Sequence, residues 1–450
     1  MISRGSQSLF LSLALGSLSA CGGGGTPPGG GEVVTPITER PVRSHYHCRV
    51  DRGLTETAPL LWSPWPVMTT TAAGNTYLAR VESTMTDPFF PGPGQVTVST
   101  FTAAGVLGPP ARLASLPPGA SVYLDVAPRT DGAAVVWADT ATDTLTFASI
   151  DGAGQTVTAA RSIPIDTAER RLGNVKLAAG SDGGFALIYQ LVTINGVREL
   201  RLAMLSAEGA LRGTPRLLAT GSSSFSDVEA QIVGVPGGYA MISVAPNAVR
   251  GRIDFSKVDL AGVETVAPRA ISVTDREGTL VGYGGFWSAG ISLLPDGDGF
   301  LAAWPEQDRG NIDNNTGASA VVRLVRLAAD GARLGTPAAL RAPVLDVDEI
   351  EPSLVKFQDS VAVLWSRGSH IYVCAGCIPD HRIDLMLIDP VDLVPVSEVV
   401  TVSPALAADN TLRGGLLRKS MAAQGASILT AFNITYHTSY RSASATFVCE

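Results

Sequence analysis

Short apolar runs, each introduced by a glycine or another small residue, recur along most of the chain. Seven of them begin 52 to 67 residues apart. They are NTYLARVE from Asn75, GAAVVWAD from Gly132, GFALIYQ from Gly184, GYAMISV from Gly238, GFLAAWPE from Gly299, SVAVLWS from Ser360 and SILTAFN from Ser427. A fixed period of this length indicates a repeated supersecondary unit rather than unrelated strands.

Each apolar run has a second short run before it and an alternating pair of runs after it. The following pair is clearest in VTVSTFTAAGVLGPPARL from Val96, LRLAMLSAEGALRGTPRLL from Leu200 and VRLVRLAADGARLGTPAAL from Val322. Alternating segments joined by a turn that contains Gly or Asp are typical of β-hairpins. Four strands repeated seven times predict an all-β fold, a seven-bladed β-propeller, with six or eight blades as the alternative.

The two ends of the chain complete each other in this arrangement. The seventh repeat has only three strands before the terminus, and the segment after the N-terminal region, CRVDRGLTETAPLL, resembles a fourth strand. A propeller must close to leave no open sheet edge, so we expect the last blade to combine strands from both termini. Cys48 and Cys449 then lie at the same hairpin end and are predicted to form a disulfide, with two free thiols as the alternative.

The first twenty residues have the layout of a secretory signal peptide. Arg4 precedes an apolar stretch that ends in Leu18-Ser19-Ala20-Cys21. This ending resembles the lipobox of bacterial lipoproteins, which implies cleavage before Cys21 and lipid attachment to it. Residues 21–43 are rich in Gly and Pro and are predicted to be a flexible tether, which leaves residues 44–450 for the propeller.

Composition agrees with an exported β protein and excludes some partners. The 33 basic and 41 acidic residues give a net charge of −8, so the chain has no basic footprint for nucleic acid. Gly22 after the cysteine resembles lipoproteins sent to the outer membrane. We therefore expect a monomer in the cell envelope, held by its lipid at the periplasmic or surface face of the outer membrane.

The stretch HIYVCAGCIPDH lies between the second and third strands of the sixth repeat. With a turn at Ala375-Gly376, Cys374 faces Cys377 and His370 faces His381. About 13 Å of extended strand separates each His from its Cys, whereas one zinc ion needs all its ligands within about 2.3 Å. A disulfide between the two cysteines is the preferred interpretation, and a zinc site or a redox pair are the alternatives.

Several long connections fall on one face of the predicted ring, where insertions often mark a binding surface. They are EQDRGNIDNNTGAS, the cysteine loop, ITYHTSYR and VTDREGTLVGYGGFW. Acidic residues also gather there, Glu351 among them, and calcium is an alternative for Asp308, Asp313, Asp346 and Asp348. A solvated acidic surface is the commoner explanation, so no cofactor is predicted.

Five aromatic residues end the second strand of a repeat: Trp137, Tyr189, Trp304, Trp365 and Phe432. The equivalent positions of the other two repeats are aligned with Val81 and Ser243. Because a propeller blade is covered on both faces, these side chains are expected to form core contacts rather than a ring of ligand-stacking groups.

No catalytic motif is present in the sequence, which lacks the serine hydrolase elbow, the zinc-protease helix and the phosphate-binding loop. The repeats resemble those of propeller lipoproteins of bacterial envelopes, a resemblance that implies the architecture and not an activity. The preferred interpretation is a non-catalytic module that binds a protein or glycan through its loop-rich face. The alternative is an exported glycoside hydrolase-like or lyase-like enzyme with a site at the mouth of the central channel.

Overall fold

The fold is described from a computed structural model of the chain. The larger compact unit extends from Val34 to Glu450. The structure describes residues 35–43, 45–59, 66–83, 93–118, 120, 122–168, 170–221, 230–245, 252–272, 290–311, 316–344, 347–369, 381–402, 415–436 and 439–450.

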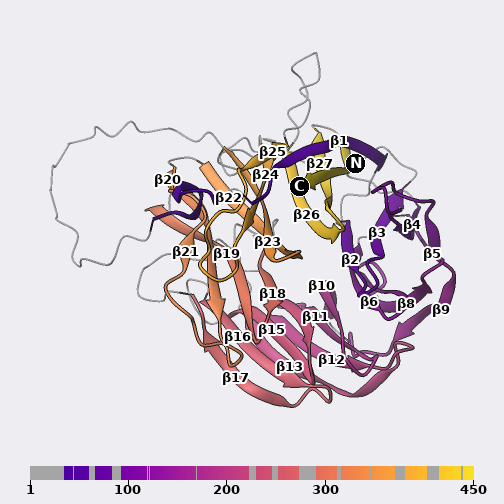
Figure 1. The fold of residues 1–450 in the computed structure, drawn as a ribbon. Helices are drawn as coiled ribbons and strands as arrows, with labels where there is room; N and C mark the ends of the chain where they lie inside the picture. The colour runs from indigo at the N-terminus through magenta and orange to yellow at the C-terminus, as the bar shows by residue number, and fades with distance from the viewer. Residues whose placement is uncertain are drawn as a thin grey trace, which may run out of the picture. The chain divides into compact units, whose positions relative to one another are not determined.

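Seven antiparallel sheets of four strands follow one another around a ring, which confirms the predicted seven-bladed propeller (Figure 1). Blade 1 contains β2 (Val67–Thr70), β3 (Thr76–Ser83), β4 (Gly94–Thr100) and β5 (Ala111–Leu116). Blade 2 contains β6 (Val122–Arg129), β7 (Gly132–Asp139), β8 (Thr144–Asp151) and β9 (Thr156–Ile163). Blade 3 contains β10 (Arg170–Ala179), β11 (Phe185–Thr193), β12 (Arg198–Leu205) and β13 (Leu211–Gly221).

The second half of the ring repeats this order. Blade 4 contains β14 (Ala230–Val235), β15 (Gly238–Ala245), β16 (Arg252–Asp259) and β17 (Glu264–Ala270). Blade 5 contains β18 (Ser292–Asp296), β19 (Gly299–Asn311), β20 (Thr316–Leu327) and β21 (Ala338–Ala339). Blade 6 contains β22 (Val347–Phe357), β23 (Ser360–Ser369), β24 (His381–Ile388) and β25 (Val400–Val402).

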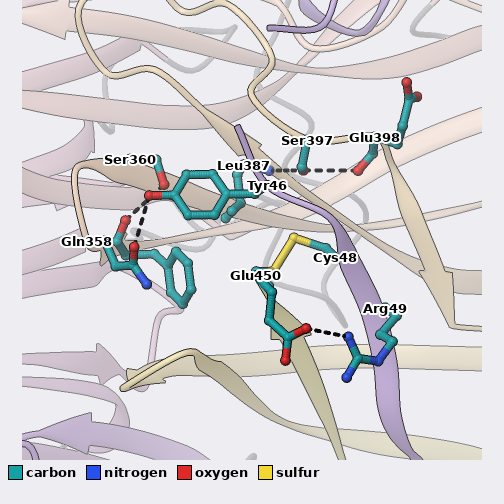
Figure 2. Close-up of a disulfide and its surroundings, with 11 residues drawn as sticks. Tyr46, Cys48, Arg49, Gln358, Ser360, Leu387, Ser397, Glu398 and Glu450 are labelled. Atoms are coloured by element: carbon teal, nitrogen blue, oxygen red, sulfur yellow. Dashed lines mark hydrogen bonds and ion pairs between the residues drawn. A yellow bond between two sulfur atoms is a disulfide. The ribbon is translucent and has the colours of Figure 1, made fainter. Parts of the chain in front are cut away.

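Blade 7 is built from both ends of the chain, as predicted. It contains β26 (Gly415–Gln424), β27 (Ser427–Tyr436), β28 (Ser439–Cys449) and, as its outer strand, β1 (Cys48–Pro59). The register places Cys48 opposite Cys449, and a disulfide joins them with their Cα atoms 4.0 Å apart (Figure 2). On either side, the backbone N–H of His47 donates to Glu450 O (2.8 Å), and the Arg49 guanidinium pairs with the Glu450 carboxylate (3.2 Å). Covalent and hydrogen bonds therefore close the ring at one point.

The core lies between neighbouring blades, where the two faces of each second strand contact different neighbours. The five predicted aromatic residues are all at most 3% exposed and face the preceding blade, which confirms their role in the core. In blade 1 the predicted alignment is wrong by one residue. Val81 packs with blade 2, and Arg80 occupies the position that faces blade 7. Because strand side chains alternate, a slip of one residue exchanges the two faces.

One predicted loop is mostly regular structure. Strands β19 and β20 pair beyond the body of blade 5, from Glu306 opposite Val321 to Asn311 opposite Thr316. The stretch EQDRGNIDNNTGAS is therefore an extended hairpin, apart from residues 312–315, which lie outside the described residues. The helical content of the described chain is one 3-10 turn, η1 (Ile37–Glu39), and none of the described helices is long and apolar enough to span a membrane.

Candidate functional site

The first strand of every blade lies at the centre of the ring and contributes to one cavity. These inner strands, which are β2, β6, β10, β14, β18, β22 and β26, enclose a volume of about 550 Å³. Small-molecule sites in proteins typically measure about 300–1,000 Å³ and combine an apolar lining with a few polar groups. The central channel therefore has the dimensions of a ligand site.

One position of the inner strand supplies most of the polar lining. In blade 2 the core position of the second strand is Trp137. In every blade, the inner-strand residue in question pairs with the second-strand residue that comes one before this core position. We call these seven residues the ring positions: Val67, Asp125, Lys176, Gln231, Ser292, Ser353 and Ser420. All seven line the cavity, and six of them are polar.

Three ring side chains bind the backbone of the next blade. Asp125 Oδ2 accepts a hydrogen bond from Leu177 N–H (2.7 Å), and Ser292 Oγ accepts one from Leu354 N–H (3.1 Å). At the closure of the ring, Ser420 Oγ accepts from Met68 N–H (2.8 Å). In each case the donor follows the ring position of the next blade by one residue. These contacts join inner strands that belong to separate sheets and so set the width of the channel.

Two neighbouring ring positions hold an acidic and a basic side chain. Asp125 is buried, and burial raises the pKa of its carboxyl group, against the opposing effects of the Lys176 charge and of hydrogen bonds from Leu177 and Val126 N–H. Lys176 is half-buried and forms no salt bridge or side-chain hydrogen bond with the described residues. Burial is therefore the largest influence on the Asp125 carboxyl group, while no polar contact with the described residues holds the Lys176 side chain.

A third charged side chain enters the lining through a β-bulge. The pairing of β22 with β23 shifts register between Ile350 and Ser353, and Glu351 in this bulge has a positive φ of 55°. It is 6% exposed and lines the cavity. A bulge redirects one side chain relative to the rest of its strand, and bulges are frequent next to active sites. Gly290 of blade 5 leaves space for the backbone of this bulge, because a Cβ atom on residue 290 would lie 2.6 Å from the Glu351 Cα.

Several candidate site residues from the sequence fall outside the part of the chain that the structure describes. Cys21, His370, Cys374, Cys377, Asp313 and Asp346 lie outside the described residues. His381, Asp308 and Asp348 lie in β24, β19 and β22, but their side chains are not described. Among the residues that the structure does describe, no group of three or more His, Cys, Asp or Glu side chains is arranged to hold a metal ion.

Asp125 and Lys176 were not singled out from the sequence, and Glu351 was considered only as one of the acidic residues on the loop-rich face. Asp125 and Lys176 share one position of the repeat, and an alignment of the inner strands would have exposed a polar residue there in six blades. Glu351 carries no such signal, because its place in the lining depends on a bulge. From the sequence, the enzymatic alternative placed its site at the mouth of the central channel without naming residues.

No family model matches the chain, and no curated protein matches it. Among solved structures, it is similar to the GH93 α-L-arabinofuranosidase of Fusarium graminearum in complex with arabinobiose, with 10% identity, a TM-score of 0.43, and coverage of 70% of this chain and 89% of that one. It is also similar to the Trypanosoma rangeli sialidase bound to the inhibitor DANA (10% identity, TM-score 0.44, coverage 90% and 60%). A protein of unknown function from Dyadobacter fermentans gives 8% identity, a TM-score of 0.44, and coverage of 90% and 99%. Similarity at this level does not transfer an activity to this chain.

Proposed function

We propose that the protein is an exported, lipid-anchored enzyme that cleaves glycans, of the hydrolase or lyase type, with its active site in the central channel. The observation that supports the proposal is the convergence of Asp125, Lys176 and Glu351, from three inner strands, on one cavity. The earlier preference for a non-catalytic module at the loop-rich face gives way to the alternative, because the best-defined site is in the channel.

The two carboxyl groups have environments suited to different roles. Glycoside hydrolysis uses one carboxyl group as a proton donor and a second as a base or nucleophile on the other side of the bond. Asp125 and Glu351 belong to blades 2 and 6, which blades 7 and 1 separate on the shorter way around the ring. Burial of Asp125 favours its protonated form, which is the form that a general acid needs. We assign Asp125 as the proton donor and Glu351 as the opposing carboxylate.

The experiment is a turnover assay on the folded chain with oligosaccharides and chromogenic glycosides. D125N and E351Q should each lower kcat at least about 100-fold, because general acid–base groups typically contribute factors of about 10² to 10⁴. D125N retains an oxygen that accepts the Leu177 N–H, so the inter-blade bond persists in this variant. E398Q, at an exposed carboxylate away from the channel, is the matched control and should keep full activity. A ligand that binds in the channel without turnover by the unmodified protein would contradict the enzymatic proposal.

Export and lipid attachment at Cys21 form a separate part of the proposal. It is supported by the resemblance of residues 1–21 to a lipoprotein leader. The mass of the protein purified from membranes should correspond to residues 21–450 plus acyl chains, and C21S should release the chain from the membrane fraction.

A further inference from the structure

The side chain of Lys176 differs in kind from those of the ring residues that form hydrogen bonds between blades. Asp125, Ser292 and Ser420 each accept a backbone N–H from the next blade. A lysine ammonium has three donor hydrogens and no acceptor, so Lys176 cannot make this contact with blade 4. The inter-blade hydrogen bonds therefore give no reason for a lysine at this position.

Among the residues that the structure describes, none makes a salt bridge or hydrogen bond that balances the charge of Lys176. It is the one cationic side chain among the described residues that line the cavity. Asp125 is near enough for the two charges to interact, but its Oδ2 is bound to Leu177 N–H and no salt bridge joins the pair. Glu351 comes from blade 6, across the channel from blade 3.

A partly desolvated ammonium group without a partner is costly, and an anionic ligand offsets that cost. A neutral sugar hydroxyl accepts a hydrogen bond from the ammonium but leaves its charge unbalanced. The cavity, at about 550 Å³, is large enough for a sugar residue, and Lys176, Asp125 and Glu351 are all part of its lining.

We infer that Lys176 holds an anionic group of the substrate, so that the glycans this channel takes carry a carboxylate or a sulfate ester. The inference rests on the proposed function for the glycan part of the ligand. The anion-binding part stands on the position of Lys176 alone.

The test is calorimetric titration of the folded chain with glucuronate, glucose and inorganic sulfate, none of which contains a glycosidic bond to be cleaved. Glucuronate should bind more tightly than glucose. K176M should weaken glucuronate binding about 10- to 100-fold, the range expected for one charge-assisted hydrogen bond, and leave glucose binding unchanged. K176R should retain binding within a few-fold. K257M is the matched control, because Lys257 lies outside the cavity and its ammonium binds Ala329 O.

The outcomes distinguish a carboxylate from a sulfate ester as the bound anion, and they distinguish the anionic substrate from the proposed enzymatic function. Binding of sulfate but not glucuronate, lost in K176M, would support a sulfated ligand. Equal binding of glucose and glucuronate, an unchanged affinity in K176M, or no binding of either anion would overturn the inference. Turnover of neutral glycans that is unaffected by K176M would uphold the proposed enzyme and reject the anionic substrate. A circular dichroism melt of K176M, matched to that of the unmodified chain, shows that a loss of binding is not a loss of fold.

Discussion

The disulfide between Cys48 and Cys449 should contribute more to stability than most single contacts in this protein. It joins two cysteines that are 401 residues apart, and reduction would remove the cross-link between β28 and the outer strand of blade 7. In the chain-entropy model, a closed loop of about 400 residues lowers the entropy of the unfolded chain by about 20 cal/mol/K, or about 6 kcal/mol at 25 °C. Measured values for natural disulfides are about 2–5 kcal/mol, so we take 6 kcal/mol as the upper bound.

The assay compares thermal unfolding of the oxidised protein with that of the C48S/C449S variant. Unfolding entropies of about 2.1 cal/mol/K per residue give about 0.85 kcal/mol/K for the propeller, so a difference of 6 kcal/mol lowers Tm by about 7 °C. C374S/C377S is the matched control, since it removes two cysteines from the chain without opening the closure of the ring. A Tm that changes by less than about 1 °C in C48S/C449S would refute the reasoning. It would mean that hydrogen bonds between β1 and β28 hold the ring closed without the covalent link.

Two further predictions concern buried positions between the blades. Burial raises the pKa of Glu349 from 4.5 to about 7, so the folded state favours the protonated form; this stabilisation is complete below pH 4.5 and is lost as pH rises through 7. E349Q should therefore be more stable than the unmodified protein at pH 8, by up to about 3 kcal/mol in urea unfolding. E398Q, at an exposed carboxylate, is the control and should show no such gain. Equal stability of E349Q and the unmodified protein at pH 8 would contradict the raised pKa of Glu349. Gly331 has a φ of 78°, and a Cβ atom there would lie 2.1 Å from the Phe255 ring, whereas Gly237, with a φ of 75°, has open space. G331A should cost at least about 2 kcal/mol of unfolding free energy and G237A about 1 kcal/mol. Equal losses would show that the aromatic side chain of Phe255 moves aside to make room for the Cβ atom.

The architecture could be predicted because it follows from patterns that survive in a degenerate repeat. Alternation in the strands, glycine at the turns and the spacing of the apolar runs gave seven blades and the shared last blade. The pairing of Cys48 with Cys449 followed from the same alignment, because strand register places the two residues opposite each other. Where the alignment had no sharp marker it failed: Arg80, not Val81, faces blade 7, since one residue more or less in a strand exchanges its faces.

The candidate site could not be predicted in the same way, because it depends on how separate sheets meet. Asp125 has a structural neighbour in Leu177, a residue of another blade, and no local pattern reports that contact. Glu351 reaches the channel through a bulge, whose position is visible in the pairing of β22 and β23 but not in the residue order. The sequence instead drew attention to the histidine and cysteine stretch, whose spacing is conspicuous along the chain.

The ring positions show how a repeat distinguishes structural from functional residues. Where a ring side chain accepts a backbone N–H from the next blade, an acceptor is required, and serine or aspartate supplies it. Blade 1 has the apolar Val67 at this position, which removes the acceptor without adding a charge. Lys176 in blade 3 departs further, because it adds a charge as well as removing an acceptor. The ring position that departs furthest from this structural role is the best candidate for a function of the channel, and that position is Lys176.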